Sequence, residues 1–456
     1  MLGETIAAIS TAPGTAAIGI VRLSGPAAIP IAGKMFRPAK VGGALAAAEN
    51  RRLILGTVRD EHNHPLDECL AVVMRAPHSY TGEDLVELHC HGSPVVLRQV
   101  LTLAIAYGAK PAGPGEFTKR AFINGKLDLL QVEAVGDLLA AGSSGAAAVA
   151  LGQLRGELSR KIEAAKNRLQ RFLVHLQAAI DYPEEVEEIT PEELLDQAKE
   201  VEQEIRALLK EAERGQRVRE GVSVVLAGKP NTGKSSLMNR LLQSERSIVA
   251  DIPGTTRDVV EESVEIAGVA FRLSDTAGIR RSGELIEQIG IKKAQEAIER
   301  AHLILAVFDG AAPFTADDAE VLRLIRGKPV LAVINKHDLP QVLDRGLLSP
   351  LPVVEVSALT GFGLEELEQA MLRQTGLEDV GLLYEQSVIS RPRQKGALAA
   401  AAMAMKNFLQ GVEEGLTADC LAMDLEEALW QLGSLTGEVH REDIINDIFA
   451  QFCVGK

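Results

Sequence analysis

The sequence has few aromatic residues and few cysteines. Aromatic residues make up 4% of the 456 residues, and the four cysteines (69, 90, 420 and 453) lack the spacing of a disulfide framework or a zinc site. This cysteine usage is typical of a reducing compartment. The chain also lacks an apolar run of the roughly 18 residues that a membrane span needs, and its first residues lack the basic region of a secretory signal. We therefore expect a cytoplasmic protein with no membrane segment.

Positive charge is scarce as well. The formal net charge is −15, which excludes attraction of nucleic acid by the charge of the whole molecule but leaves room for a local basic patch. Apolar residues account for 46% and charged residues for 24%, as in ordinary globular proteins. A chain of 456 residues is too long for one hydrophobic core, so we expect two to four domains.

The residue patterns change three times along the chain. An α+β pattern, with expected strands at 18–22 and 86–90 and a helix at 94–107, gives way to long apolar stripes of helical period. These stripes predict one continuous helix from Leu151 to Ile180 and another that starts at Pro191 and stops at Gly215. Alternating strands and helices follow, and then more helix. The predicted fold is therefore an α+β N-terminal domain, an all-α helical domain built from two segments, and an α/β Ras-like domain inserted between them, with boundaries at 1–118, 119–217, 218–378 and 379–456.

The segment Gly228–Ser235 matches the phosphate-binding pattern G-x-x-x-x-G-K-[ST]. An apolar run at 222–227, expected to be a buried strand, precedes it, and an expected helix follows. In that context successive backbone N–H groups and the positive helix end bind phosphate oxygens. Lys234 is expected to reach the β- and γ-phosphates, and Ser235 to bind Mg²⁺.

Three further motifs follow in order, each after an expected strand. Asp275–Gly278 is suited to hold Mg²⁺ through water and to contact the γ-phosphate. Asn335–Asp338 is suited to guanine, because its aspartate can accept two hydrogen bonds that adenine does not offer. Ser357–Leu359 would contact the guanine oxygen. Four such motifs at strand ends predict a GTP-binding site at the edge of a parallel sheet.

Two positions of this site are ambiguous from the residues alone. Within Asp251–Asp258, Thr256 is the preferred second Mg²⁺ ligand and Thr255 the alternative. Ile279 stands where Ras-type GTPases have a glutamine that orients water. Three downstream glutamates could take that role, although each is equally well explained as a solvated helix residue: Glu284, Glu287 and Glu296.

These motifs, together with 80–87, 115–128 and the terminal Phe452-Cys453-Val454-Gly455-Lys456, resemble the MnmE (TrmE) family of tRNA modification GTPases, among the TrmE/Era-like GTPases. The resemblance spans the whole chain. It implies a tetrahydrofolate-binding N-terminal domain, a helical domain and an inserted GTPase domain. The GTP contacts that it and the motifs together imply are Asn231, Thr232, Gly233, Lys234, Ser235, Ser236, Ala250, Asp251, Ile252, Pro253, Gly254, Thr255, Thr256, Asp275, Thr276, Ala277, Gly278, Asn335, Lys336, Asp338, Ser357, Ala358 and Leu359.

The resemblance also implies a K⁺ ion that takes the place of an arginine finger when two GTPase domains pair. Arginine fingers contribute about 10³–10⁵ in rate. The matching K⁺ ligands are Asn231, Ala250, Ile252 and Thr255. The family's water-orienting glutamate matches Glu287, which the resemblance favours over Glu284.

The remaining implications concern the two ends of the chain. Arg22, Glu87, Lys126 and Lys456 match the family's contacts to 5-formyltetrahydrofolate or another one-carbon tetrahydrofolate, and Cys453 matches a near-terminal cysteine of undefined role. The family forms homodimers. With the flavoprotein MnmG (GidA), it adds an aminomethyl or carboxymethylaminomethyl group to C5 of the wobble uridine of certain tRNAs.

Alternative interpretations remain. A ribosome-assembly GTPase of the Era type would share the nucleotide motifs, and a folate enzyme with a vestigial GTPase domain would not need intact nucleotide motifs. The run His89-Cys90-His91 suggests a metal site, but on a strand its two histidines share one face and the cysteine takes the other.

Overall fold

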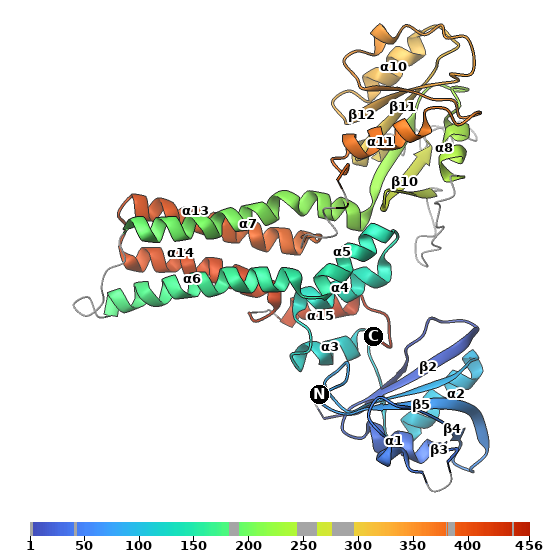
Figure 1. Cartoon of the computed structure of the whole chain (residues 1–456), viewed down its shortest axis with the longest axis vertical. Coiled ribbons are helices and arrows are strands. Elements are labelled where there is room, and N and C mark those ends of the chain that lie inside the picture. The colour runs from blue at the N-terminus through green and yellow to red at the C-terminus, as the bar shows by residue number, and fades with distance from the viewer. Residues whose placement is uncertain are drawn as a thin grey trace. The chain divides into compact units, whose positions relative to one another are not determined.

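The computed structural model describes residues 3–40, 43–181, 191–243, 262–275, 296–379, 381, 388–439 and 442–456 (Figure 1). Residue contacts divide the chain into two compact units. The first contains residues 1–136 and 433–456, and the second contains residues 137–432. The predicted boundaries at 118, 217 and 378 are not tested by this division and stay predictions.

The first unit is built on a mixed seven-stranded sheet with the order β3-β4-β5-β6-β2-β1-β7. Only the β1–β7 pair is parallel. The strands are β1 (Ile6–Ile9), β2 (Ala16–Ser24), β3 (Phe36–Pro38), β4 (Leu53–Arg59), β5 (Pro65–Met74), β6 (Leu85–Gly92) and β7 (Lys110–Pro111). The helices and the one 3-10 turn are α1 (Ala28–Met35), η1 (Leu45–Ala47), α2 (Pro94–Ala106), α3 (Glu116–Ile123) and α15 (Glu442–Ala450), and α4 (Leu129–Ala140) crosses the border between the units.

One face of this sheet carries the core of the unit. Alternate strand residues such as Val21, Leu88 and Cys90 pack with residues of α1 and α2. The intervening residues point to the opposite face, since side chains alternate along a strand. That second face carries Arg22, Glu87 and the candidate folate site.

The helical part of the second unit contains α5 (Ser144–Leu154), α6 (Glu157–Asp181), α7 (Pro191–Glu220) and α13 (Pro392–Glu413), together with α14 (Ala418–Thr436), whose last residues belong to the first unit. Helices α7 and α13, far apart in sequence, pack along each other (Figure 1). The all-α domain made from two chain segments is thereby confirmed.

Two helix ends differ from the predictions, and both involve glycine. The helix predicted to run from Leu151 to Ile180 is broken, because Gly156 adopts φ +74° between α5 and α6. The stop predicted at Gly215 is wrong, because α7 continues to Glu220 and ends before Gly221 at φ +80°. Gly215 serves a packing role instead: a Cβ there would lie 2.2 Å from the carbonyl oxygen of Ile389.

The rest of the second unit is a six-stranded sheet with the order β13-β12-β11-β8-β10-β9, parallel except for β9. Its strands are β8 (Val222–Ala227), β9 (Glu262–Ile266), β10 (Val269–Asp275), β11 (Leu303–Asp309), β12 (Val330–Asn335) and β13 (Val353–Glu355). Its helices are α8 (Lys234–Leu242), α10 (Ala316–Leu324), η3 (Arg345–Leu348) and α11 (Leu364–Gln374).

Both faces of this sheet are buried. Along β11, Leu303, Leu305 and Val307 pack with α8 and α11, whereas the intervening Ile304 and Phe308 pack on the side of α10. This burial explains the continuous apolar runs that predicted the strands. The α/β part of the predicted fold class is confirmed. None of the helices in the described ranges is long and apolar enough to cross a membrane.

Candidate functional site

The phosphate loop connects β8 to α8, as predicted. Gly228 has φ +156°, and a Cβ at this position would lie 2.4 Å from the carbonyl oxygen of Val307 on β11. The next turn needs positive φ at Asn231 (+66°) and Gly233 (+91°). Because α8 begins at Lys234, its unpaired N–H groups and positive dipole end face the loop. The loop therefore has the backbone geometry of an anion-binding site.

Two side chains of α8 point into this region. The Lys234 ammonium donates hydrogen bonds to the carbonyl oxygens of Gly228 (2.8 Å) and Lys229 (2.7 Å), so it lies inside the loop. The Ser235 hydroxyl donates to Asp275 Oδ2 at 2.9 Å. The hydroxyl and the carboxylate come from the two motifs predicted to bind Mg²⁺, and both supply the hard oxygen atoms that this ion prefers.

Asn335 connects the phosphate loop to the guanine motifs. Its side chain is buried, donates from Nδ2 to the carbonyl oxygen of Thr232 at 2.9 Å, and accepts at Oδ1 from the backbone N–H of Ala358 at 3.0 Å. One amide thus joins three loops that lie apart in the sequence. The motif pattern placed Asn335 in the site, but this bridging role was not predicted.

The remaining guanine-motif residues are also brought together. Ser357 Oγ donates a hydrogen bond to Asp338 Oδ1. Lys336 Nζ forms an ion pair with Asp309 at 2.7 Å, and Ala358 and Leu359 follow Ser357 in the same loop. His337 stacks on Phe362, with ring centroids 4.5 Å apart and planes 10° apart. This stack holds two base-recognition loops against each other, and the sequence reasoning missed it.

Another unpredicted contact braces the phosphate loop from outside. Lys229 Nζ lies 2.7 Å from Asp318 Oδ2, at the start of α10. Burial opposes the charge of Asp318. The hydrogen bonds from Lys229 and Thr315 outweigh it and hold the pKa of Asp318 below its usual value. The lysine occupies a free position of the motif, so only spatial proximity reveals its partner.

Part of the predicted site lies outside the described residues. These positions are Ala250, Asp251, Ile252, Pro253, Gly254, Thr255, Thr256, Thr276, Ala277, Gly278, Ile279, Glu284 and Glu287. Glu296 is the first described residue after this gap.

In the first unit, Arg22 and Glu87 form a half-buried ion pair. They are cross-strand partners on β2 and β6. Arg22 Nε donates a hydrogen bond to Glu87 Oε1 at 2.9 Å, and Arg22 Nη2 forms an ion pair with the same oxygen at 2.8 Å. The guanidinium carbon of Arg22 also lies 5.7 Å from the ring centroid of Tyr80 and 5.6 Å from that of Phe117. Two aromatic rings and a carboxylate therefore fix the orientation of this arginine.

The C-terminal tail lies in the same unit, next to this pair. Gly115 N–H donates to the carbonyl oxygen of Cys453, Val454 bridges to Pro114, and Phe117 N–H donates to the carbonyl oxygen of Lys456 at 3.2 Å. Burial and the nearby Arg22 charge lower the pKa of Lys456, while Glu87 opposes that shift. Lys456 thus shares an electrostatic environment with two residues from the opposite end of the chain.

The other two predicted residues are placed differently. Lys126 is exposed and donates to the carbonyl oxygen of Pro77 at 3.3 Å, beside the 77–82 loop. No described interaction links Lys126 directly to Arg22 or Glu87. Cys453 is a free, exposed cysteine.

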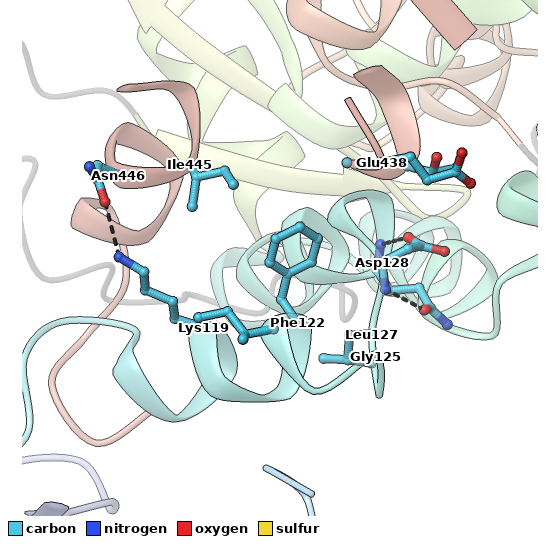
Figure 2. Close-up of a pocket in the computed structure, with 12 residues that line it drawn as sticks. Lys119, Phe122, Gly125, Leu127, Asp128, Glu438, Ile445 and Asn446 are labelled. Carbon is cyan, nitrogen blue, oxygen red and sulfur yellow. Dashed lines mark hydrogen bonds between the residues drawn. The ribbon is translucent and has the colours of Figure 1, made fainter. Parts of the chain in front are cut away.

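A separate cavity of about 810 Å³ lies between α3, the start of α4 and α15 (Figure 2). Phe122, Leu127 and Ile445 contribute apolar walls. Lys119 donates to Asn446 at 3.0 Å across it, as the dashed line in Figure 2 shows. None of the predicted site residues lines this cavity.

Comparisons with known proteins agree with these observations. A model described as "GTP-binding protein TrmE N-terminus" matches residues 5–126, and one described as "MnmE helical domain" matches residues 129–453. A "tRNA modification GTPase MnmE" from Thermoanaerobacter pseudethanolicus is 45% identical, with 100% of both chains covered. Its namesake from Bacillus subtilis is 41% identical over 99% of this chain and 100% of its own. The G domain of the FeoB iron transporter of T. maritima is 29% identical and covers 34% of this chain and 98% of its own, but its TM-score of 0.27 is too low to support an argument.

Proposed function

This chain belongs to the MnmE family of tRNA modification GTPases, and we propose from that premise that it hydrolyses GTP to drive the modification of wobble uridine in tRNA. With the flavoprotein MnmG (GidA), it adds an aminomethyl or carboxymethylaminomethyl group at C5, using a one-carbon unit from tetrahydrofolate. The protein works in the cytoplasm as a homodimer. The alternative of ribosome assembly is not favoured, because the full-length relatives are named tRNA modification GTPases and both family models are of the MnmE (TrmE) type.

Binding of GTP is supported by the loops that Asn335 joins. Ser235, Asp275 and Thr256 would hold Mg²⁺, which neutralises charge on the phosphates. Asp338, oriented by Ser357, would accept the guanine N–H groups. Lys234 would exchange its bonds to loop carbonyl oxygens for bonds to phosphate, a substitution that costs little because its donors are already aimed into the loop.

Potassium dependence is supported by the position of Asn231. This residue is exposed and lies at the turn of the loop, where its φ is positive. Its amide oxygen would be one K⁺ ligand, with Thr255 and the carbonyl oxygens of Ala250 and Ile252 as the others. Glu287 would orient the attacking water.

The observation that carries the folate part is the docking of the C-terminal tail beside Arg22 and Glu87. Glycine is the only residue type that fits at position 455, since φ is +101° and a Cβ would lie 2.2 Å from the carbonyl oxygen of Ile9. The tail is therefore shaped to hold Lys456 where it is. Lys456 and Arg22 would bind the carboxylate and polar ring edge of a folate, Glu87 would bind its amino-pyrimidine N–H groups, and Lys126 would add a positive charge.

Dimerisation through the N-terminal units is supported by the open face of the sheet. Four cross-strand partners form one row across this face. They are Leu55 on β4, Leu70 on β5, His89 on β6 and Ile20 on β2. This row and its neighbours expose large apolar side chains: Ile18 (58%), Leu53 (52%), Leu55 (49%) and Leu70 (37%). Contiguous exposed apolar residues of this kind mark interaction surfaces.

The proposal is tested by measuring GTP hydrolysis in K⁺ and in Na⁺ at equal ionic strength. A much higher rate in K⁺ is expected, and equal rates would overturn the role of Asn231. Glu287→Ala should keep GTP affinity and lose turnover, with Glu284→Ala as the matched control. Mass analysis of wobble nucleosides in cells lacking the protein should show the unmodified uridine, and a normal nucleoside profile would refute the role in tRNA modification.

A further inference from the structure

His89 is a third ionisable residue on the face that carries Arg22 and Glu87. It lies two residues after Glu87 on β6, so the two side chains share a face. Its cross-strand neighbours are Ile20 on β2 and Leu70 on β5, and its side chain is 24% exposed. His89 Nε2 lies 3.2 Å from Glu87 Oε2.

The hydrogen bonds divide the two oxygens of Glu87 between two partners. Arg22 donates a hydrogen bond to Oε1 and pairs with it through Nη2, and His89 contacts Oε2. A carboxylate has about four lone-pair sites, so each oxygen of Glu87 keeps a site for a further N–H donor. On Oε2, the orientation of that site is set by the contact with His89.

The same contact keeps the carboxylate ionised. Burial opposes the charge of Glu87. The hydrogen bond from His89 and the charge of Arg22 outweigh burial and lower the pKa of Glu87 below its usual value. His89 thus contributes to both the charge and the orientation of this acceptor.

We propose that His89 is a positioning residue for folate recognition, which orients Glu87 Oε2 toward the amino-pyrimidine N–H groups of the ligand. This inference rests on the proposed folate-binding function. The next histidine on the strand provides the contrast. His91 lies on the same face, but its Nδ1 pairs with Asp67 at 2.6 Å and its side chain is 72% exposed.

The experiment measures the affinity of the full-length protein for 5-formyltetrahydrofolate by isothermal titration calorimetry. His89→Leu keeps most of the volume but removes the donor, and should weaken binding about tenfold, as loss of a hydrogen bond to a charged group does. His89→Gln can still donate an N–H to Glu87 and should stay within about threefold of the wild type. His91→Gln, the matched control, should bind as the wild type does.

A double-mutant cycle separates positioning from a general effect on the fold. In a Glu87→Gln background, His89→Leu should cost little further affinity, because the carboxylate that it orients is gone. GTP hydrolysis should be unchanged in every His89 variant that folds. If His89→Leu does not fold, His89→Asn replaces it, because its shorter amide does not reach Oε2.

The outcomes separate the two proposals. Wild-type protein that does not bind the folate refutes the proposed folate function. Wild-type protein that binds, with His89→Leu binding equally well, overturns the role of His89 and leaves the folate function standing. Equal weakening by His89→Leu and His89→Gln also overturns it, because the donated hydrogen bond would then not be what matters.

Discussion

The carboxylate of Asp137, on α4, joins the end of α7 to the start of α13. It accepts hydrogen bonds from Arg391 Nε (3.0 Å) and Nη2 (2.8 Å), and lies 3.4 Å from Arg219 Nη1. Arg219 lies in the last turn of α7, just before β8, and Arg391 directly precedes α13. Arg219 also donates to the carbonyl oxygen of Ser390 at 2.9 Å. Asp137→Ala should therefore loosen the end of α7 and the start of α13 at once.

The expected cost follows from burial. The Asp137 side chain is only 7% exposed, and removing one partner of a buried ion pair costs about 3–5 kcal/mol. The two arginines are 22% and 17% exposed and can regain water, so the low end, about 3 kcal/mol, applies. With a urea dependence of about 2 kcal/mol per molar, the unfolding midpoint should fall by about 1.5 M.

The assay is urea unfolding followed by emission of Trp430, the chain's single tryptophan, which lies on α14 of the helical domain. The matched control is Glu213→Ala. Its pair with Lys395, at 3.0 Å, joins the same helices α7 and α13, but both side chains are exposed. An exposed pair is worth about 0–1 kcal/mol, so the control should shift the midpoint by less than about 0.5 M. Equal shifts for the two variants would refute the reasoning.

Three further predictions follow from single contacts. Gly455→Ala should weaken 5-formyltetrahydrofolate binding about tenfold, because its Cβ would meet the backbone of Ile9, whereas Gly33→Ala, with nothing within 4 Å, should not; calorimetry compares the two. Asn335→Ala should weaken GTP binding about tenfold in a nucleotide titration, since it leaves buried backbone groups of two loops without their partner. Glu87 has a lowered pKa, so the stability that it adds is present above a pH of about 4.3 and is lost as pH falls through its folded pKa. Wild type should accordingly be more stable than Glu87→Gln at neutral pH, and this difference should disappear at acid pH. A difference that persists at acid pH would contradict the lowered pKa of Glu87.

Two glycines show that local sequence patterns are insufficient to predict where helices begin and end. Gly156 lies within a stripe that predicted one continuous helix, whereas Gly215 was predicted to end the next helix. Gly156 breaks the helix because its φ is positive, whereas Gly215 stays inside α7 because Ile389, distant in sequence, needs the space of a missing side chain. Whether α7 continues through Gly215 therefore depends on its packing against Ile389, which is a contact between segments distant in sequence.

In the candidate sites, too, the sequence predicted local features but not contacts between distant residues. The spacing of the four nucleotide motifs predicted the strand ends that carry Gly228, Asp275, Asn335 and Ser357, and those predictions are confirmed as structure. Their roles in binding stay predictions. The bridge by Asn335 and the brace between Lys229 and Asp318 have no local signal, because each joins residues that are distant in the sequence.

The sequence by itself determined the local elements and the loop that can bind phosphate, because period, glycine placement and helix starts act over a few residues. Only the tertiary structure decided how the C-terminal tail brings Lys456 under the charges of Arg22 and Glu87, and that His89 contacts the Glu87 carboxylate. These contacts depend on strand register and on the path of the C-terminal tail, which are set by packing between distant segments.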